Sequence, residues 1–494
     1  MGNLEIERKF LLYPCSMKRF LKKEELEWKA VEIEQFYLLA GESGVERYRK
    51  YGNRYIKTIK RGSGLVREEK EVDISKTLYE EAKRQNSSGV IKKVRRVVNF
   101  DDYTFEIDSF KKPFKGFNLL EVEFKSESDA KSFELPDIFK EILVAEVTEN
   151  RDFTNGSLSR SMKIPSIETD LKDIFAQIDK REEFLKASTN VVFSAYESGS
   201  NAVKALFYTL LKTIEANRDA ILHKEYDPER LHQLRVAMRK LRALLSQMKP
   251  LFSYDWRDEH KEKLAYLMRQ TGKQRDIDVY LEAIPNYKQM LLKDLQDGLD
   301  ALKDYLTQKS KESKDELINF LQSDTFNREL ETLFDFCRSE ESIGFFKSYS
   351  GPIIIEVKQA LRKRYKSLLR KGNALDKNSL AHEYHLLRID AKKLRYMIEF
   401  FSSLFNKDAY DKMLKWLKTI QSILGEHQDL EVQSQHIKEL SQLPELHSDK
   451  TMAALNELRR KMVQIEERKR QEFRDTFKLF IKTEDLFSEM ICRF

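Results

Sequence analysis

The spacing of hydrophobic and polar residues changes once along the chain, near residue 160. Before that point the two kinds of residue alternate with a period of two, which predicts β-strands. The segments with this pattern are 31–40, 45–51, 54–62, 65–74, 91–100, 103–110 and 118–125. "RGSGL" joins two of them and is typical of a hairpin turn. Helices are expected at about 75–86 and 128–141.

Beyond residue 160 the hydrophobic residues recur with the 3.6-residue period of an α-helix. Nearly everything from about 198 to the end is predicted to be amphipathic helix. The segment 155–195 is a candidate junction: it begins with turn-rich residues and then has a helical pattern over 171–186. The pattern therefore predicts an α+β protein with antiparallel strands first and an all-α region after them.

The polar residues of the first half lie on alternate positions, so each strand carries them on one face. In "NLEIERKF" the residues Glu5, Glu7 and Lys9 share a face in this way. The other groups that do so are Arg47 with Arg49, Arg67 with Glu69 and Glu71, Lys93 with Arg95, Glu106 with Asp108, and Glu121 with Glu123. For any single pair, a half-buried sheet with one solvated face would look the same.

The opposite strand faces are partly apolar, which distinguishes the set as a whole from a simple solvated sheet. They carry Ile6, Phe10, Val66, Val72, Val94, Val98, Leu120, Val122 and Phe124. If these residues pack outward against helices, the charged faces must point inward. A closed antiparallel barrel with a polar lumen has this arrangement.

Such a lumen would hold many cations and many carboxylates, and unpaired buried charge is costly. A polyanion with bound divalent cations would neutralise both kinds of group. Arg and Lys would bind phosphate oxygens, while clustered Glu would bind a hard cation such as Mg²⁺ or Mn²⁺. "EIERK" (5–9) is then predicted to present two metal ligands and one phosphate-binding ammonium.

The motifs of the first half resemble the CYTH superfamily, the triphosphate tunnel enzymes. "EIERK" matches the family's ExExK signature, and further motifs follow in the family's order over about residues 1–165. They are "EQFYL", "ERYRK", "YIKTIKRG", "VREEKEV", "KKVRR", "FEID", "LLEVEF" and "EVTENRDFTNGSL". One departure is Asp152, where the family more often has an aromatic residue. The resemblance implies an eight-stranded antiparallel tunnel that hydrolyses or cyclises triphosphates with a divalent metal.

Carried over residue by residue, the resemblance implies three sets of site residues. The metal ligands would be Glu5, Glu7, Glu69, Glu71, Glu121 and Glu123. The triphosphate would be bound by Lys9, Arg47, Arg49, Lys60, Lys93 and Arg95. Tyr37 and Lys60 would orient or activate the attacking water. Lys57 is left out because it has the opposite strand parity to Lys60.

The helical half contains an internal duplication. "LHQLRVAMRKLR" begins at Leu231 and "YHLLRIDAKKLR" begins 153 residues later, at Tyr384. The same offset relates Gly272 to Gly425 and Asp276 to Asp429. Two helical bundles of the same topology, packed as pseudo-symmetric halves, are therefore expected.

Each copy carries a basic stripe beside its apolar stripe, about 100° round the helix. The stripes consist of His232, Arg235, Arg239 and Arg242 in one copy and His385, Arg388, Lys392 and Arg395 in the other, widened by Lys240 and Lys393. A single basic helix face is usually only solvated, and His232 and His385 could simply bond nearby carboxylates. Two matching faces favour a shared groove for a polyanion. A zinc site is not favoured, because no second ligand has suitable spacing.

The duplicated segments resemble the CHAD domain, a histidine-containing α-helical module, over about residues 198–480. The resemblance implies that the basic stripes bind polyphosphate. "TGKQRDIDV" and "LGEHQDLEV" match the module's second motif, but Gln274 stands in the first where His427 stands in the second. The two sites are therefore not equivalent in sequence.

Composition agrees with long solvated helices: 35% of the 494 residues are charged, with only 16 Gly and 9 Pro. The net charge of +7 is compatible with a polyanionic partner. Cys15, Cys337 and Cys492 form no metal or disulfide spacing, and no run is long and apolar enough for a membrane span or a signal peptide. A cytoplasmic protein without a membrane partner is expected.

These observations predict a tunnel domain (1–165), a junction (166–195) and a helical domain (196–494) made of two repeats, about 196–345 and 349–494. The predicted activity is metal-dependent hydrolysis of inorganic triphosphate or short-chain polyphosphate, with polyphosphate bound by the helical domain. Cyclisation of ATP, as in class IV-type adenylate cyclases, and a non-catalytic polyphosphate-binding scaffold are the alternatives. Nucleic-acid binding is disfavoured, because the stripes lack interleaved exposed aromatic residues.

Overall fold

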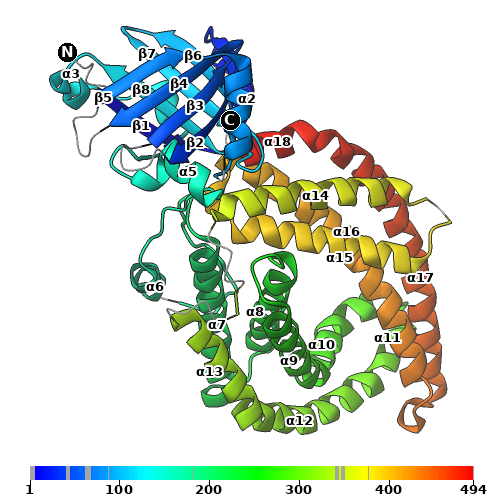
Figure 1. Ribbon diagram of the computed structural model, residues 1–494. Helices are drawn as coiled ribbons and strands as arrows, with labels where there is room; N and C mark the ends of the chain where they lie inside the picture. Colours follow the sequence, from blue (N-terminus) through cyan, green and yellow to red (C-terminus); the bar gives the residue numbers. More distant parts are fainter. Residues whose placement is uncertain are drawn as a thin grey trace.

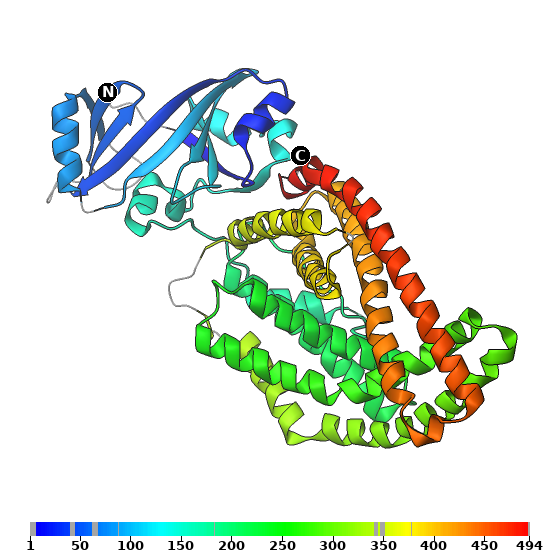
Figure 2. The same ribbon diagram turned by 90° about the vertical axis from the view of Figure 1, so that its right-hand side faces the viewer.

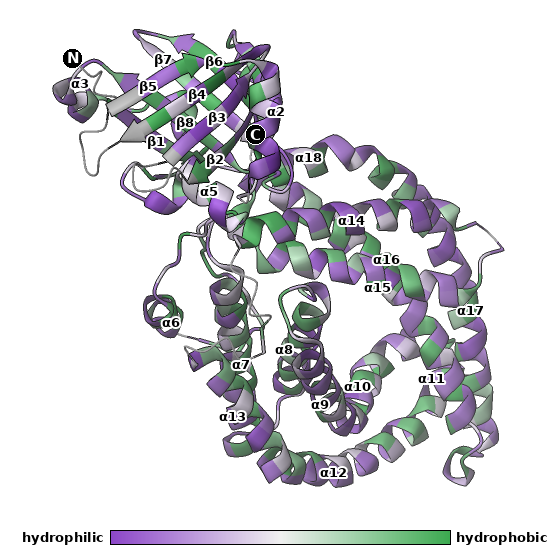
Figure 3. Ribbon diagram, in the orientation of Figure 1, coloured by the Kyte–Doolittle hydropathy of each residue, from purple (hydrophilic) through white to green (hydrophobic). Residues whose placement is uncertain are grey.

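The computed structural model describes residues 6–39, 45–61, 68–86, 88–181, 183–339, 344–345, 351–376 and 378–492. A β-sheet forms the N-terminal part and helices form the rest (Figure 1). Figure 3 shows hydrophilic and hydrophobic residues interleaved along both strands and helices, as the two periods predict. None of the described helices is long and apolar enough to cross a membrane.

The described strands form one antiparallel sheet in the order β5-β4-β3-β2-β6-β7-β8-β1-β9. Their bounds are β1 Ile6–Leu12, β2 Lys29–Leu39, β3 Val45–Tyr51, β4 Arg54–Arg61, β5 Glu68–Asp73, β6 Ile91–Phe100, β7 Tyr103–Phe110, β8 Asn118–Phe124 and β9 Leu143–Glu146. The expected closed sheet of eight strands is corrected in two respects. Nine strands are described, and within the described residues no pairing joins the edge strands β5 and β9.

The sheet nevertheless curls strongly. Strands β2 and β1 are four positions apart in the sheet order, which would separate them by about 19 Å if the sheet were flat. Yet the charges of Lys9 on β1 and Glu121 on β8 act on the pKa of Tyr37 on β2. The faces that carry these residues therefore turn toward one another.

Part of the opposite face of the sheet is packed against helices, as its apolar positions predict, but Val72 on β5 is 46% exposed. Phe10, Leu120 and Val122 are at most 2% exposed. Phe105 contacts the ring of Phe139 at 4.8 Å between centroids. The expected helix over 128–141 is divided into α3 (Glu127–Ser132) and α4 (Asp137–Lys140), because Pro136 between them cannot donate a helical hydrogen bond. The expected helix at 75–86 is α2 (Lys76–Gln85).

Several short elements were not predicted from the sequence. They are α1 (Met17–Lys23), strand β9, and α5 (Asn155–Ser161) at the end of the sheet region. In the junction, α6 (Leu171–Asp179) ends seven residues before the predicted helical pattern does, and residues 183–198 are mostly irregular. The chain thus passes from sheet to helices through a segment with one short helix.

The helices of the C-terminal part repeat with the offset seen in the sequence. The first repeat contains α7 Gly199–His223, α8 Pro228–Gln247, α9 Tyr254–Gln270, α10 Gly272–Met290, α11 Lys293–Gln296, α12 Asp300–Gln322 and α13 Asp324–Arg338. The second contains α14 Ile353–Ala374, α15 Ala381–Phe400, α16 Lys407–Leu440, α17 Asp449–Phe480 and α18 Glu484–Cys492. Shifted by 153 residues, α8 coincides with α15, and the start of α9 coincides with the start of α16. In Figure 1, α12 and α17 run along the outer edge of this part.

The repeats differ where the first one breaks its helix. Between α9 and α10, Thr271 has φ −90° and ψ 5°, outside the helical range. At the corresponding position the second repeat has Leu424, which is buried within the continuous helix α16. One long helix therefore replaces two shorter ones.

The sheet and the helical part are held together at the end of β1. The Tyr13 hydroxyl donates to the Leu404 carbonyl at 2.5 Å, and the Lys358 ammonium donates to the Pro14 carbonyl at 2.7 Å. That ammonium also lies 3.9 Å from the centre of the Tyr13 ring, an attractive cation–π arrangement. Figure 2 shows α18 and α14 beside the sheet at this junction.

Candidate active site and candidate phosphate-binding groove

The charged residues of the sheet lie on its inner face because the strand register aligns them. Lys9 on β1 is paired with Glu121 on β8, and Glu7 is paired with Glu123. Glu121 is in turn paired with Glu106 on β7. Lys9 and Glu121 thus form a cation–carboxylate pair, while the pairs Glu7–Glu123 and Glu121–Glu106 place carboxylates beside one another on the same side of the sheet.

The centre of this face is a buried ionic network around Arg95. Its guanidinium donates to Asp108 at 2.8 and 2.7 Å, to Glu121 at 2.7 Å, and also to Glu106. Lys93, with no exposed surface, donates to Asp108 at 2.5 Å. Lys9 lies 3.2 Å from both Glu121 and Glu7. Each buried carboxylate in the network thus contacts at least one cation.

Burial and ion pairing shift the pKa values of this network in opposite directions. Burial raises the pKa of Asp108, but the neighbouring Lys93 and Arg95 lower it to about 2. Burial lowers the pKa of Lys93 to about 8, although Asp108 counteracts the shift. For Lys9, burial also works to lower the pKa, but Glu121 and Glu7 outweigh it and the pKa is raised. At neutral pH Asp108 is therefore ionised, and Lys93 and Lys9 are mostly charged.

A second group of side chains lies on β2, β3, β4 and β5. The Arg47 guanidinium donates to Glu71 at 2.9 Å and to the Thr58 hydroxyl at 3.1 Å. Arg49 donates to the Gln35 side-chain oxygen at 3.2 Å. Burial lowers the pKa of Arg49, and the like charges of Arg47 and Arg95 lower it further. The two arginines therefore lie close enough to repel each other, which favours an anion between them.

Tyr37 is placed beside these arginines by Gln35, whose amide donates to the Tyr37 hydroxyl at 2.9 Å. Burial raises the pKa of the Tyr37 phenol, while Arg47 and Arg49 act in the opposite direction. The phenol is therefore protonated at neutral pH and can donate a hydrogen bond.

Not every predicted site residue can be placed. Glu5 lies outside the described residues. Lys60 and Glu69 are paired in register between β4 and β5, and their side chains lie outside the described part of the structure. Lys57 was excluded by strand parity, and its ammonium indeed lies on the other face, 2.7 Å from Glu46.

Asp108, Thr58 and Gln35 lie on the inner face but were not among the predicted site residues. Each is buried and contacts a predicted phosphate-binding or catalytic side chain. Asp108 shares strand parity with Glu106, so the alternation pattern already marked its face. The neutral residues Thr58 and Gln35 carry no charge signal in the sequence.

In the helical part, the two basic stripes lie on α8 and α15, which contact each other. Each stripe faces the helix that follows it in its own repeat. Arg235 donates to the Met268 carbonyl at 2.6 Å and to the Thr271 hydroxyl at 2.8 Å, while Arg388 lies 3.7 Å from Asp429. His385 contacts the Gln428 amide at 2.6 Å. Burial lowers the pKa of His232, and the nearby Arg275 lowers it further.

The stripes retain unused hydrogen-bonding capacity. The Nε atoms of Arg235, Arg242 and Arg395 are buried and have no hydrogen-bond partner among the described residues. Around Lys392, burial and the charges of Arg239, Arg388 and Arg395 lower the pKa to about 7. Cations from both stripes thus approach one ammonium closely.

Lys240, predicted to widen one stripe, does not join them. It is 7% exposed, donates to the Ala187 carbonyl at 2.8 Å, and lies 3.3 Å from Glu399. Lys393, its counterpart on α15, is half-buried and does not line the pocket described next.

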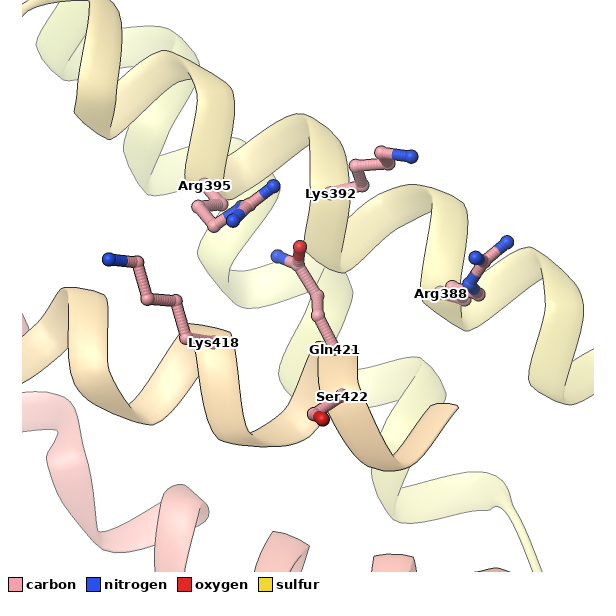
Figure 4. A pocket seen from close by; sticks show the side chains of 6 residues that line it. All are labelled: Arg388, Lys392, Arg395, Lys418, Gln421 and Ser422. Carbon is pink, nitrogen blue, oxygen red and sulfur yellow. The ribbon is translucent and has the colours of Figure 1, made fainter. Parts of the chain in front are cut away.

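Between α15 and α16 lies a pocket of about 290 Å³ (Figure 4). Three of its side chains come from the basic stripe of α15 and three from α16: Arg388, Lys392, Arg395, Lys418, Gln421 and Ser422. The α16 residues were not predicted from the sequence. The pocket therefore combines four cationic side chains with an amide and a hydroxyl.

Both parts of the chain are similar to known proteins. A model of the CHAD domain matches residues 205–438. An inorganic triphosphatase of Nitrosomonas europaea is 34% identical over 162 residues, which is 98% of that protein and 32% of this chain. The chain belongs to the CYTH family and carries a CHAD domain.

Two solved structures are also similar. The CHAD domain of the plant Ricinus communis covers 60% of this chain and 97% of its own, with 23% identity and a TM-score of 0.51, which supports the helical fold. The crystal structure of an inorganic triphosphatase covers 32% of this chain and 95% of its own, with 30% identity and a TM-score of 0.26.

CYTH enzymes use a divalent metal, for which carboxylates are the expected ligands. Among the residues that the structure describes, no three His, Cys, Asp or Glu side chains are grouped closely enough to hold an ion. The donor type nevertheless fits, because Glu7, Glu121 and Glu123 offer only carboxylate oxygens, which suit Mg²⁺ and Mn²⁺. Mg²⁺ is usually held by one or two carboxylates together with substrate phosphates and water. The CYTH carboxylates therefore fit a metal that arrives with its substrate.

Proposed function

We propose that the CYTH domain, about residues 1–165, hydrolyses inorganic triphosphate or short-chain polyphosphate to shorter phosphates with Mg²⁺ or Mn²⁺. The proposal is supported chiefly by the inner face of the sheet, where cations of β6 and β1 lie beside carboxylates of β7 and β8. An ATP-binding enzyme would also need a nucleoside pocket, and the inner face offers charged and small polar groups.

In this proposal the curled sheet encloses the substrate as a tunnel. The triphosphate is bound by Lys9, Arg47, Arg49, Lys60, Lys93 and Arg95. Arginine suits this task because its planar fork can donate two hydrogen bonds to one phosphate. Asp108 holds Lys93 and Arg95 in place through the hydrogen bonds already described. The cations are thus ordered before substrate arrives, which lowers the cost of positioning it.

Glu7, Glu121 and Glu123, with Glu5, Glu69 and Glu71, would hold the metal. Once bound, the metal would supply Lewis-acid neutralisation of phosphate charge. Glu121 now contacts Lys9 and Arg95, at 3.2 and 2.7 Å. Substrate phosphates that attract these two cations would leave Glu121 available as a ligand.

Tyr37 and Lys60 are proposed to act on the attacking water. Because burial keeps the Tyr37 phenol protonated, Tyr37 can orient the water by hydrogen bonding but cannot remove its proton. Lys60, two strands further along on β4 and paired with Glu69, is assigned to activation of the water. Arg47 and Arg49 lie beside Tyr37 and would fix the adjacent phosphate.

The CHAD domain, proposed to span residues 196–494, is assigned to binding of polyphosphate along the stripes of α8 and α15. The buried Nε atoms of Arg235 and Arg242, which have no hydrogen-bond partner among the described residues, support an anionic ligand. The low pKa of Lys392 supports it too, since a phosphate chain would relieve the repulsion among the cations.

The testing experiment is a phosphate-release assay on the full chain. It compares inorganic triphosphate, ATP, thiamine triphosphate and long-chain polyphosphate, each with Mg²⁺ and with Mn²⁺. Preferred release from triphosphate is expected. Formation of cyclic AMP from ATP would instead identify a cyclase, and no turnover of any substrate would leave only a binding protein.

A further inference from the structure

The pocket between α15 and α16 is built differently from the equivalent place in the first repeat. Its α15 side chains have cationic counterparts 153 residues earlier, in Arg235, Arg239 and Arg242. Its α16 side chains have different counterparts: Lys418, Gln421 and Ser422 correspond to Ala265, Met268 and Arg269. The two repeats therefore share their stripes but not the opposing helix surface.

In the first repeat, Met268 and the end of α9 lie against the basic stripe of α8. The Met268 sulfur lies 3.9 Å from the Arg242 guanidinium, so a thioether faces that cation. Because α9 ends at Gln270, carbonyls in its last turn have no partner within the helix, and Arg235 donates to one of them. Arg235 is thus already engaged by the protein.

In the second repeat, α16 continues through the equivalent point, so the carbonyl at position 421 lies inside a helix. Arg388 contacts Asp429 instead, at a loose 3.7 Å. The Gln421 amide donates to the Ala391 carbonyl at 2.9 Å, which fixes this side chain between the two helices. Figure 4 shows Gln421 reaching from α16 toward the side chains of α15.

The charge in the pocket is incompletely neutralised. The carboxylates beside its four cations are Asp429, Glu399 and Glu426. Glu399 lies 3.7 Å from Arg395 and is shared with Lys240, while Glu426 accepts from Ser422 and is held by Lys469 at 2.7 Å. An added anion with more than one negative charge would restore the balance.

We propose that this pocket is the principal phosphate anchor of the CHAD domain, with Lys418 and Gln421 as ligands beside the α15 stripe. The first repeat then binds phosphate more weakly than this pocket does. The inference rests on the proposed polyphosphate binding and adds an asymmetry to it. The bound group is a phosphate unit, which can belong to a long chain or to a free short phosphate.

The test is calorimetric titration of the full chain with long-chain polyphosphate, triphosphate and orthophosphate, in EDTA to prevent turnover. The variant Lys418→Ala/Gln421→Met places the residues of the first repeat at these two positions of α16. Lys412→Ala removes a charge from an exposed position of α16 outside the pocket and serves as the matched control. Circular dichroism checks that each variant is folded.

Lys418→Ala/Gln421→Met is expected to weaken polyphosphate binding by about tenfold or more at low salt and to reduce the salt slope by about one. Lys412→Ala should change neither. The reciprocal variant Ala265→Lys/Met268→Gln should tighten binding. A loss confined to long chains identifies a chain unit as the ligand, and a loss that includes triphosphate or orthophosphate identifies a free phosphate.

The anchor is overturned if wild type binds polyphosphate and Lys418→Ala/Gln421→Met matches Lys412→Ala in affinity and salt slope. It is likewise overturned if the reciprocal variant gains nothing. Absence of any polyphosphate binding by the wild type would overturn the proposed function of the CHAD domain as well.

Discussion

Binding of polyphosphate should be accompanied by uptake of a proton at Lys392. Burial and three arginines lower the pKa of this ammonium to about 7. A phosphate group nearby would oppose the repulsion and raise the pKa toward the ordinary value of 10.5. Since binding then takes up a proton, affinity must fall as pH rises above 7.

The pKa sets the size of the effect. At pH 8 the free protein carries a proton on Lys392 in only about one-tenth of molecules, so binding takes up about 0.9 proton. At pH 6 the residue is already about nine-tenths protonated, and its uptake falls to about 0.1 proton. His232 can add uptake at pH 6, whereas at pH 8 its lowered pKa keeps it neutral in the free protein.

The assay is titration calorimetry at pH 8 in two buffers with different ionisation enthalpies, whose difference in heat gives the protons taken up. Long chains keep terminal phosphates, which titrate near neutrality, to a small fraction. Lys392→Arg is the matched control, because it keeps the charge but does not titrate in this range. Uptake in wild type that persists in Lys392→Arg, or no uptake in either, would refute the reasoning.

Three further results are expected. Arg47→Ala and Arg49→Ala should each raise KM for triphosphate, with Lys only partly restoring it; unchanged steady-state kinetics would show that neither contacts substrate. Asp108→Asn should lower the free energy of unfolding by about 3–5 kcal/mol in urea titrations, because it leaves Lys93 buried and unpaired; stability equal to wild type would contradict the network. Polyphosphate binding should weaken steeply with added salt and be lost on joint neutralisation of Arg235, Arg239, Arg388 and Arg395, while triphosphate turnover persists. Retained binding at wild-type affinity would show that the stripes do not bind polyphosphate and are only solvated helix faces.

The inner face of the sheet could be predicted because strand periodicity is strict. Side chains alternate between two faces, so parity alone assigned Lys9, Arg47 and Glu121 to one side and Lys57 to the other. What parity could not supply is which of these residues meet. That Arg95 joins Asp108 and Glu121 depends on the pairing of β6, β7 and β8, which residue spacing does not encode.

The duplication was likewise visible in sequence, and the bounds of α8 and α15 follow it. The fate of individual cations was not visible. Lys240 lies next to the stripe residues in the sequence of α8, but it pairs with Glu399 of the neighbouring helix α15 and therefore does not join them. Lys418 and Gln421 escaped prediction because they lie on α16, outside the repeated basic motif.

Strand β9 and the break at Pro136 show a further limit. The four residues of β9 have too little alternation to stand out, and they form a strand because β1 offers them an unpaired edge. Such short elements are determined by their neighbours more than by their own sequence.

The central claim is that the inner face of the sheet performs metal-dependent triphosphate hydrolysis. It is tested most directly by phosphate release from inorganic triphosphate by the full chain with Mg²⁺ or Mn²⁺, with and without EDTA, in wild type, Glu7→Gln and Glu121→Gln. Glu27→Gln, at an exposed position before β2, is the matched control. Release should require metal, fall by on the order of 10² in the two inner-face variants, and be unchanged in the control. Undiminished release in EDTA, or wild-type turnover in both Glu7→Gln and Glu121→Gln, would contradict the account.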